Sequence, residues 1–423
     1  MVPKGWKLTS LGEVCSGSLQ TGPFGSQLHA HEYTDEGVPV LMPKDLINYR
    51  ANNESAAKIP EHRADDLKKH TLQSGDLLFS RRGDVARFAL IESDYPRSLC
   101  GTGCLKATPN KAHSPLFLSY FLQKNAVKKW LEQNAVGQTM PNMNTAILAE
   151  LPLMVASSRE EEDKIAKILS TWDKAISTTE KLIETSKQQK KSLMQQLLTG
   201  KKRLVNPETG KAFEGDWEEV KLGELGQTFT GLTGKTKEDF GSGAKYIPYI
   251  NIFNNSSVNI AKLEKVHVGS EEKQNVVQFG DVFFTTSSET PDEVGMSSVM
   301  LSEPEEPIYL NSFCFGFRPN DTSTIIPEFM QYLLRSSRVR RSISVLAQGA
   351  TRYNLSKVQL LKINLLLPTS DEQKKIASVL TIADKEIEVL EAKLAHFKQE
   401  KKALMQQLLT GKRRVKVDED VAA

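Results

Sequence analysis

The chain contains the same segment twice. Residues 190–203 read KKSLMQQLLTGKKR and residues 401–414 read KKALMQQLLTGKRR, so 12 of the 14 positions are identical. The second copy lies 211 residues after the first, which is half of the 423-residue chain almost to the residue. Solenoid proteins have a much shorter period, of about 20–50 residues. The sequence therefore predicts a tandem duplication of one large unit.

Weaker matches extend the duplication over most of each half. Trp6 and Trp217, also 211 residues apart, are each followed within a few residues by Leu-Gly-Glu. At similar offsets, 73–79 resembles 278–284, 115–122 resembles 327–334, and 137–142 resembles 349–354. Each half therefore consists of a globular part of about 155 residues followed by a segment of about 45.

The two 45-residue segments carry the hydrophobic pattern of long coiled-coil helices. Mostly apolar side chains recur at alternating spacings of four and three residues, from Ile165 to Leu197 and from Ile376 to Leu408. This period of 3.5 residues is typical of a coiled-coil seam. The residues that we assign to the seam and to partner docking are Trp172, Ile176, Ile183, Ile387, Leu390 and Leu394.

The ends of both segments also favour helices. A Ser followed three residues later by Glu or Gln, at 158–161 and at 370–373, matches a capping box. Gly200 and Gly411 stand where left-handed C-terminal stops belong. We expect the two helices to pair as an antiparallel coiled coil within the chain, with pseudo-twofold symmetry. Two separate amphipathic helices, each packed on its own domain, are the alternative.

The globular parts have the pattern of mixed α/β domains. Strand-like runs occupy 38–42, 77–80, 246–252 and 282–286, and one helix per half, near 115–134 and 327–346, begins at a proline. The predicted class is α+β, with two tandem globular domains and two long helices. Its segments are a first domain at 1–156, a helix at 157–200, a connector and second domain at 201–368, a helix at 369–412 and a flexible tail at 413–423.

Composition is that of an ordinary globular protein. The chain is 39% hydrophobic and 25% charged, and its net charge of +3 permits a nucleic-acid partner without requiring one. It has no run of 18 apolar residues, and its start, MVPKGWKLTS, lacks the apolar core of a signal peptide. Four cysteines make no disulfide framework. We expect a cytoplasmic protein with no membrane partner.

No enzyme signature is complete. The segment GLTGKT at 231–236 lacks the first glycine of a phosphate-binding P-loop, because Phe229 occupies that position. Cys100 and Cys104 have the wrong spacing for a zinc knuckle, and no second Cys or His pair completes a site. GxSxG, HExxH and the Asn-Pro-Pro-aromatic motif of amino-methyltransferases are absent. We expect no catalytic residue, no metal site and no cofactor in this chain.

Basic residues are concentrated near particular loops. Seven basic residues and no acidic one lie between 329 and 370, and Arg81 and Arg82 follow the first Gly-Asp turn. Basic side chains beside Ser, Thr and Asn suit contacts with phosphates and base edges, although a solvated helix face is the plainer interpretation of 338–341. The two halves agree in their scaffold residues and differ in these loops. This contrast predicts two recognition modules with different targets.

The arrangement resembles the specificity subunit of type I restriction–modification systems over essentially the whole chain. The resemblance rests on the duplication, the Trp…Leu-Gly-Glu opening, the Gly-Asp-Leu-Leu-Phe turn and strand, Gly-x-x-x-x-Asn before each long helix, and above all the repeated MQQLLTG ending. It implies two target recognition domains, each reading one half of a split, asymmetric DNA sequence in the major groove. It also implies that the helices measure the unread spacer.

The same resemblance implies the partners. The chain would bind double-stranded DNA and dock two methyltransferase subunits, which would carry S-adenosylmethionine, and through them restriction subunits. The alternatives are a recognition subunit of another methyltransferase class and a coiled-coil scaffold with protein-binding heads. The residues expected at DNA are Phe24, Ser26, Lys44, Arg81, Arg82, Gln138 and Thr139 in the first half, and Lys235, Asn254, Ser287, Ser288, Arg352, Tyr353 and Asn354 in the second, where Asn354 could instead cap the following element.

Overall fold

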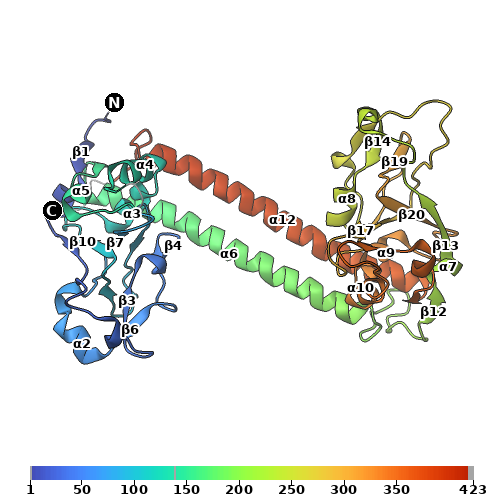
Figure 1. The fold of residues 1–423 in the computed structure, drawn as a ribbon, viewed down its shortest axis with the longest axis horizontal. Coiled ribbons are helices and arrows are strands. Elements are labelled where there is room, and N and C mark those ends of the chain that lie inside the picture. The colour runs from blue at the N-terminus through green and yellow to red at the C-terminus, as the bar shows by residue number, and fades with distance from the viewer. Residues whose placement is uncertain (1, 138–139, 418–423) are drawn as a thin grey trace. The chain divides into compact units, whose positions relative to one another are not determined.

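The computed structural model describes residues 2–137 and 140–417 (Figure 1). Its contacts divide the chain into two compact units, of which the first is Met1–Glu180 with Lys393–Ala423 and the second is Lys181–Ala392. The division cuts through two helices of 39 residues each, α6 (Arg159–Leu197) and α12 (Ser370–Leu408). Each unit therefore contains a globular head and one half of both long helices. The first head precedes α6, and the second head lies between α6 and α12.

The first head is built on a six-stranded sheet with the order β2-β10-β7-β8-β5-β4. Its central strand β7 is buried at every residue, and Phe79 of β7 pairs with Leu105 of β10. The strands are β1 (Lys7–Ser10), β2 (Leu19–Thr21), β3 (Val38–Leu41), β4 (Leu46–Ile47), β5 (Arg50–Ala51), β6 (Ala57–Ile59), β7 (Leu77–Ser80), β8 (Phe88–Leu90), β9 (Leu99–Cys100), β10 (Cys104–Ala107) and β11 (Pro152–Val155). The helices are α1 (Leu11–Val14), α2 (Glu61–Asp66), α3 (Pro115–Leu122), α4 (Asn125–Asn134) and α5 (Thr145–Ala149).

The second head contains a four-stranded sheet, β13-β20-β16-β18, and a three-stranded sheet, β15-β14-β19. Its strands are β12 (Glu218–Lys221), β13 (Gly226–Thr230), β14 (Phe240–Ile247), β15 (Glu264–Val266), β16 (Val282–Thr285), β17 (Ser287–Ser288), β18 (Ser297–Val299), β19 (Ile308–Leu310), β20 (Cys314–Pro319), β21 (Tyr353–Asn354) and β22 (Asn364–Leu367). Its helices are α7 (Leu222–Leu225), α8 (Tyr249–Asn254), α9 (Pro327–Leu333), α10 (Ser337–Ser344) and α11 (Lys357–Leu360). The predicted mixed α/β class is confirmed.

Three local expectations were wrong. The single helix predicted near 327–346 is broken into α9 and α10, because Ser336 is extended and its hydroxyl accepts a hydrogen bond from the Val339 N–H as an N-cap. Its counterpart near 115–134 is likewise broken, at Lys124, into α3 and α4. The strand predicted over 246–252 ends at Ile247, because Pro248 starts α8 instead.

The C-terminal end of each long helix is built into the core of the head that belongs to the other half. Leu408 and Leu409 of the second repeat lie in the core of the first head, together with Trp6. Leu197 and Leu198 of the first repeat lie in the core of the second head. Each unit is therefore stabilised internally by apolar contacts between segments that are far apart in the sequence.

An ion pair between an arginine and a buried carboxylate accompanies each of these junctions. Arg414 binds both carboxylate oxygens of Glu161 at 2.5 and 2.8 Å in the first unit. Arg203, which stands 211 residues earlier, binds both oxygens of Glu372 at 2.7 and 2.8 Å in the second. Both carboxylates are almost fully buried, with side chains 2% and 1% exposed. A bidentate arginine is the strongest common partner for such a carboxylate.

Within each unit the two helix halves pair in an antiparallel sense. In the first unit Trp172 of α6 contacts Phe397 of α12, with 5.5 Å between ring centroids. In the second unit the Lys187 ammonium lies 2.6 Å from Glu391. The predicted seam residues Ile183 and Ile387 are buried there, and Trp172, Ile176, Leu390 and Leu394 are partly buried. The antiparallel pairing within the chain that we expected is thus present in both units.

All four cysteines are buried and none forms a disulfide. Over residues 2–137 and 140–417, no helix combines the length and apolar character that crossing a bilayer requires.

Candidate nucleic-acid interface

Both heads build the same backbone frame from two loops. In the second head β17 pairs antiparallel with β21, which places Ser287 opposite Asn354. In the first head Arg82 stands opposite Asn142 in an antiparallel bridge. Arg82 and Ser287 both lie two residues beyond the end of the central strand of their sheet, β7 or β16. At one position of this frame the heads therefore differ, with Arg82 in the first and Ser287 in the second, and at the facing position both carry an asparagine.

In the first head Arg81 connects this frame to the loop that carries Phe24. Its guanidinium lies 5.9 Å from the centroid of the exposed Phe24 ring. The backbone N–H of Arg81 donates to the Gly103 carbonyl, and the backbone carbonyl of Arg81 accepts from the Met143 N–H, both at 2.8 Å. Among the described residues, the buried Arg81 Nε and Asn142 Oδ1 atoms have no hydrogen-bond partner.

The other predicted residues of the first head lie on neighbouring loops. Gly103, whose carbonyl binds Arg81, packs closely against Pro43, since a Cβ on Gly103 would lie 2.9 Å from Pro43 Cδ. Lys44, the next residue after Pro43, is exposed. Lys44 Nζ donates to the Ser55 carbonyl at 3.3 Å. Ser26 is exposed, two residues after Phe24. Gln138 and Thr139 lie outside the described residues.

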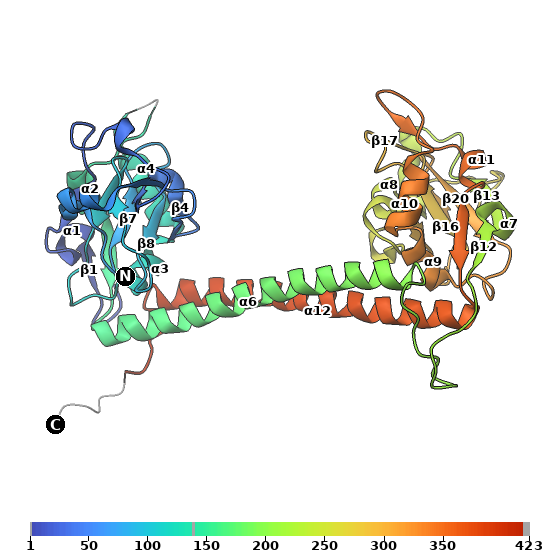
Figure 2. The ribbon, with the colours of Figure 1, turned by 90° about the horizontal axis from the view of Figure 1, so that it is seen from below.

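In the second head three of the predicted residues, Ser287, Ser288 and Arg352, line an open cavity of about 460 Å³. The exposed Arg352 donates from Nε to the Ser287 hydroxyl at 3.1 Å, and Ser288 donates to Glu293 at 3.0 Å. The cavity is lined by Tyr249, Ile250, Phe253, Ser287, Ser288, Glu289, Glu293, Thr351 and Arg352. Tyr353 and Asn354 form the strand beside it. In Figure 2, β17 lies at the side of the second head that faces away from α6 and α12.

Two predicted residues of the second head lie apart from this cavity. The Lys235 ammonium is paired with Glu272 at 2.6 Å, and its side chain is only 4% exposed. This contact lowers the pKa of Glu272 to about 2. Asn254 is exposed but lines a different cavity, next to the long helices. Lys235 is therefore held within the protein, and Asn254 is separated from the Ser287 frame.

Sequence reasoning missed the aromatic and acidic side of the cavity. Tyr249 and Phe253 stack with ring centroids 5.9 Å apart, and Tyr249 donates to the Ser287 carbonyl at 2.9 Å. Their spacing of four residues is a helical signal, which the strand-like pattern of 246–252 concealed. Glu289 and Glu293 occupy the loop after β17. A carboxylate repels phosphate, but it accepts hydrogen bonds from the amino groups of cytosine or adenine.

The basic run between 329 and 370 is partly structural. Arg335 donates to the carbonyls of Ser297, Ile252, Phe253 and Asn255 at 2.7–3.0 Å. Arg340 donates to the carbonyls of Gly295, Asp292 and Val294. Burial lowers the pKa of Arg335 to about 10. Arg335 therefore fixes the segment that carries Phe253 and Asn254, and Arg340 fixes the loop that carries Glu293. Neither is a solvated cation.

Comparison with known proteins agrees with the duplication. The model of the type I restriction modification DNA specificity domain matches the chain twice, at residues 3–188 and 214–399. A putative type I restriction enzyme specificity subunit, MjaX, from Methanocaldococcus jannaschii is 27% identical, over 98% of this chain and 95% of that protein. The MjaVIII specificity subunit of the same organism is 29% identical, over 73% of this chain and 72% of its own length.

Solved structures with the same fold are also specificity subunits. The S subunit of a type I restriction–modification system from M. genitalium matches with a TM-score of 0.57 at 16% identity, covering 95% of this chain and 96% of that one. The HsdS subunit from Thermoanaerobacter tengcongensis matches with a TM-score of 0.52 at 18% identity, covering 97% and 98%. At these identities the likeness establishes the fold.

Proposed function

Because the chain belongs to the type I restriction–modification DNA specificity family, we propose that each of its heads reads one half of a split DNA target. The observation that carries the proposal is the frame shared by the two heads, in which an asparagine, Asn142 or Asn354, faces Arg82 in one head and Ser287 in the other. A common scaffold with different groups at its edge suits recognition of two unlike half-sites.

The side chains around each frame suit different bases. Arg81 and Arg82 carry the fork of donors that suits guanine O6 and N7 in the major groove. The second head combines Arg352 with Ser288 and Glu293, so it offers acceptors for an adenine or cytosine amino group as well as a donor. Contacts to phosphates would add a sequence-independent attraction that weakens as salt is raised.

In this proposal the chain is a non-catalytic subunit. It docks two methyltransferase subunits along α6 and α12, and through them restriction subunits. S-adenosylmethionine is bound by the methyltransferase partner. The specificity-domain matches cover both heads and most of both long helices, which supports assigning recognition and docking to one chain.

Methyl transfer in the presence and absence of this chain tests the proposal. A candidate methyltransferase subunit is mixed with DNA and labelled S-adenosylmethionine, either alone or with the purified chain. We expect sequence-specific methylation only when the chain is present. Equal methylation at the same positions without the chain would contradict the proposal, and a stable complex that methylates nothing would favour a protein-binding scaffold.

Replacing Arg352 by Ala should weaken recognition by the second head. A well-placed contact to a base is worth about 1–3 kcal/mol, so we expect methylation at the native target to fall about 5- to 150-fold at limiting complex. Lys362→Ala is the matched control, since it removes one exposed positive charge from the same head outside the cavity. Equal losses for the two variants would mean that only the net charge matters.

A further inference from the structure

Each head is fastened to both long helices by the same three kinds of side chain. In the first unit the Tyr120 hydroxyl on α3 donates to Asp173 Oδ2 on α6 at 2.6 Å. The ammonium of Lys401 on α12 lies 2.5 Å from the other oxygen of Asp173. The same ammonium lies 5.3 Å from the centroid of the Tyr120 ring. The Asp173 carboxylate on α6 therefore links the head helix α3 to the other long helix, α12. We call this set of Tyr120, Asp173 and Lys401 a joint.

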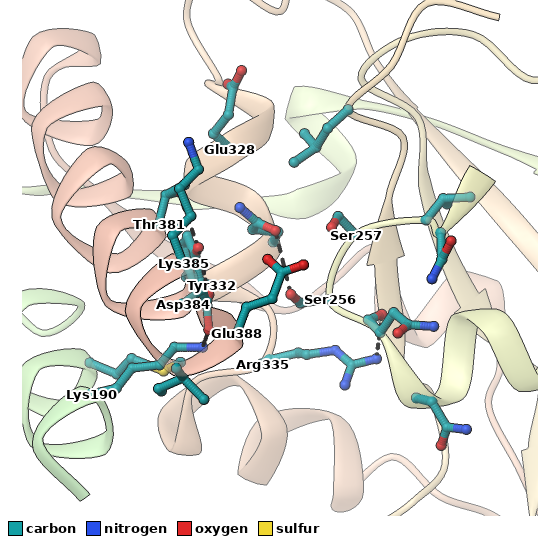
Figure 3. Close-up of a pocket in the computed structure, with 18 of the residues that line it drawn as sticks. Lys190, Ser256, Ser257, Glu328, Tyr332, Arg335, Thr381, Asp384, Lys385 and Glu388 are labelled. Atoms are coloured by element: carbon teal, nitrogen blue, oxygen red, sulfur yellow. Dashed lines mark hydrogen bonds and ion pairs between the residues drawn. The ribbon is translucent and has the colours of Figure 1, made fainter. Parts of the chain in front are cut away.

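The second unit repeats this joint with the roles of the long helices exchanged (Figure 3). The Tyr332 hydroxyl on α9 donates to Asp384 Oδ2 on α12 at 2.8 Å. Lys190 of α6 donates to Asp384 Oδ1, and its ammonium lies 5.3 Å from the centroid of the Tyr332 ring. The same tyrosine hydroxyl also shares a hydrogen bond with Thr381 at 3.1 Å.

The joints differ from ordinary surface ion pairs. Burial raises the pKa of both tyrosines, so their hydroxyls remain protonated donors at neutral pH. The lysine side chains are only 16% and 22% exposed. By contrast, Lys398–Glu180 and Lys187–Glu391 connect the same helices through side chains that are about half exposed. The latter kind of pair contributes little to stability.

An open cavity lies beside each joint. Asp384, Tyr332 and Lys190 line a cavity of about 910 Å³ in the second unit. Asp173, Tyr120 and Lys401 line one of about 680 Å³ in the first. Beside each joint, open space therefore separates part of the head from the long helices. The helix ends are packed into the cores of the heads. Further along the helices, beside these cavities, the directional contacts of the tyrosine, aspartate and lysine add a second point of attachment for each head.

We propose that Asp173 and Asp384 are positioning residues that hold each head at one angle on its helix segments and thereby restrict the complex to one spacer length. The inference rests on the proposed reading of a split DNA target. Asparagine cannot replace aspartate in this role, because the tyrosine and the lysine bind different carboxylate oxygens. In asparagine one of these two positions is an amide NH2, which donates and would face a donor.

The test maps methylation by the complex of the full chain with its methyltransferase on a library of DNA targets. The library keeps both half-sites and varies the spacer by single base pairs. For Asp384→Asn and Asp173→Asn we expect methylation at the neighbouring spacer lengths to rise about tenfold relative to the native spacer, with the half-site sequences unchanged. Tyr332→Phe and Tyr120→Phe, which keep the ring and lose only the hydroxyl, should relax the spacer less.

Matched controls are Glu391→Gln and Glu180→Gln, which break the exposed pairs between the same helices without touching a head. Thermal unfolding confirms that each variant is folded, and if the Asn variants do not fold, the Phe variants decide the question. Unchanged spacer selectivity in folded variants, whether or not overall methylation falls, would overturn the inference. If the wild-type complex methylates no split motif, the proposed function fails instead.

Discussion

A chain truncated after Lys402 should lose the folded state of its first head, although the truncation removes no residue of that head. Leu408 and Leu409 would leave the first core, as would the partly buried Leu404 and Met405 that pack against it. Loss of each buried leucine costs about 2–5 kcal/mol when it is replaced by alanine. The combined loss is comparable with the whole stability of a typical domain, about 5–15 kcal/mol.

Electrostatics adds to this effect. The truncation also removes Arg414, the bidentate partner of the buried Glu161. Removing the partner of a buried charge costs up to about 3–5 kcal/mol when both groups are buried. Glu161 is 2% exposed and Arg414 is 43% exposed, so the cost here is smaller and adds to the loss of apolar contacts. The two terms act on the same unit, so the first head should unfold while the second keeps its structure.

Hydrogen exchange followed by mass spectrometry measures this outcome peptide by peptide. We expect amide protection to disappear from the first head and to persist in the second. Truncation after Val417 is the control, because it leaves in place every contact described for the first unit. Normal protection of the first head in the shorter chain would show that the C-terminal segment is dispensable to it.

Replacing Arg335 by Ala should disable the second head without removing any group expected to contact DNA. The substitution leaves four carbonyls without their donor, those of Ile252, Phe253, Asn255 and Ser297. A buried polar group left without a partner costs about 1–3 kcal/mol, and relief of the buried charge offsets part of the sum. We expect a net loss of about 3 kcal/mol and a fall in Tm of the second unit of about 6–12 °C.

The same variant should lose methylation at the native target, because α8 carries Phe253 at the edge of the cavity. Arg335→Lys should not restore it, since one ammonium cannot reproduce the planar fork of donors. Arg338→Ala is the matched control, an exposed arginine three residues further along. Scanning calorimetry and methylation assays check both readouts. Equal, small effects for Arg335→Ala and Arg338→Ala would mean that the arginine run acts only through its charge.

The architecture was predictable because its signals are periodic. The 211-residue repeat and the heptads from Ile165 to Leu197 are visible without any knowledge of tertiary contacts. They predicted the two heads, both long helices and their antiparallel pairing. Local breaks were less visible, since only the extended conformation of Ser336 separates α9 from α10.

The candidate interface was predictable only in part, because charge alone does not reveal a partner. Arg335 and Lys235 have the same formal charge as Arg352, yet both are engaged within the protein. The carbonyls that bind Arg335 lie up to 83 residues away in the sequence, and Glu272 lies 37 residues from Lys235. Arg352, Ser287 and Ser288 were identified because they lie where the two repeats differ. Whether they contact DNA stays a prediction.

Long-read methylation mapping tests the central claim, that each head reads one half of a split target, most directly. DNA would be mapped from cells that express the methyltransferase with the wild-type chain, with Arg82→Ala or with Arg352→Ala. We predict one split motif for the wild type, in which Arg82→Ala alters only one half and Arg352→Ala only the other. A continuous motif, or two variants that alter the same bases, would contradict the account.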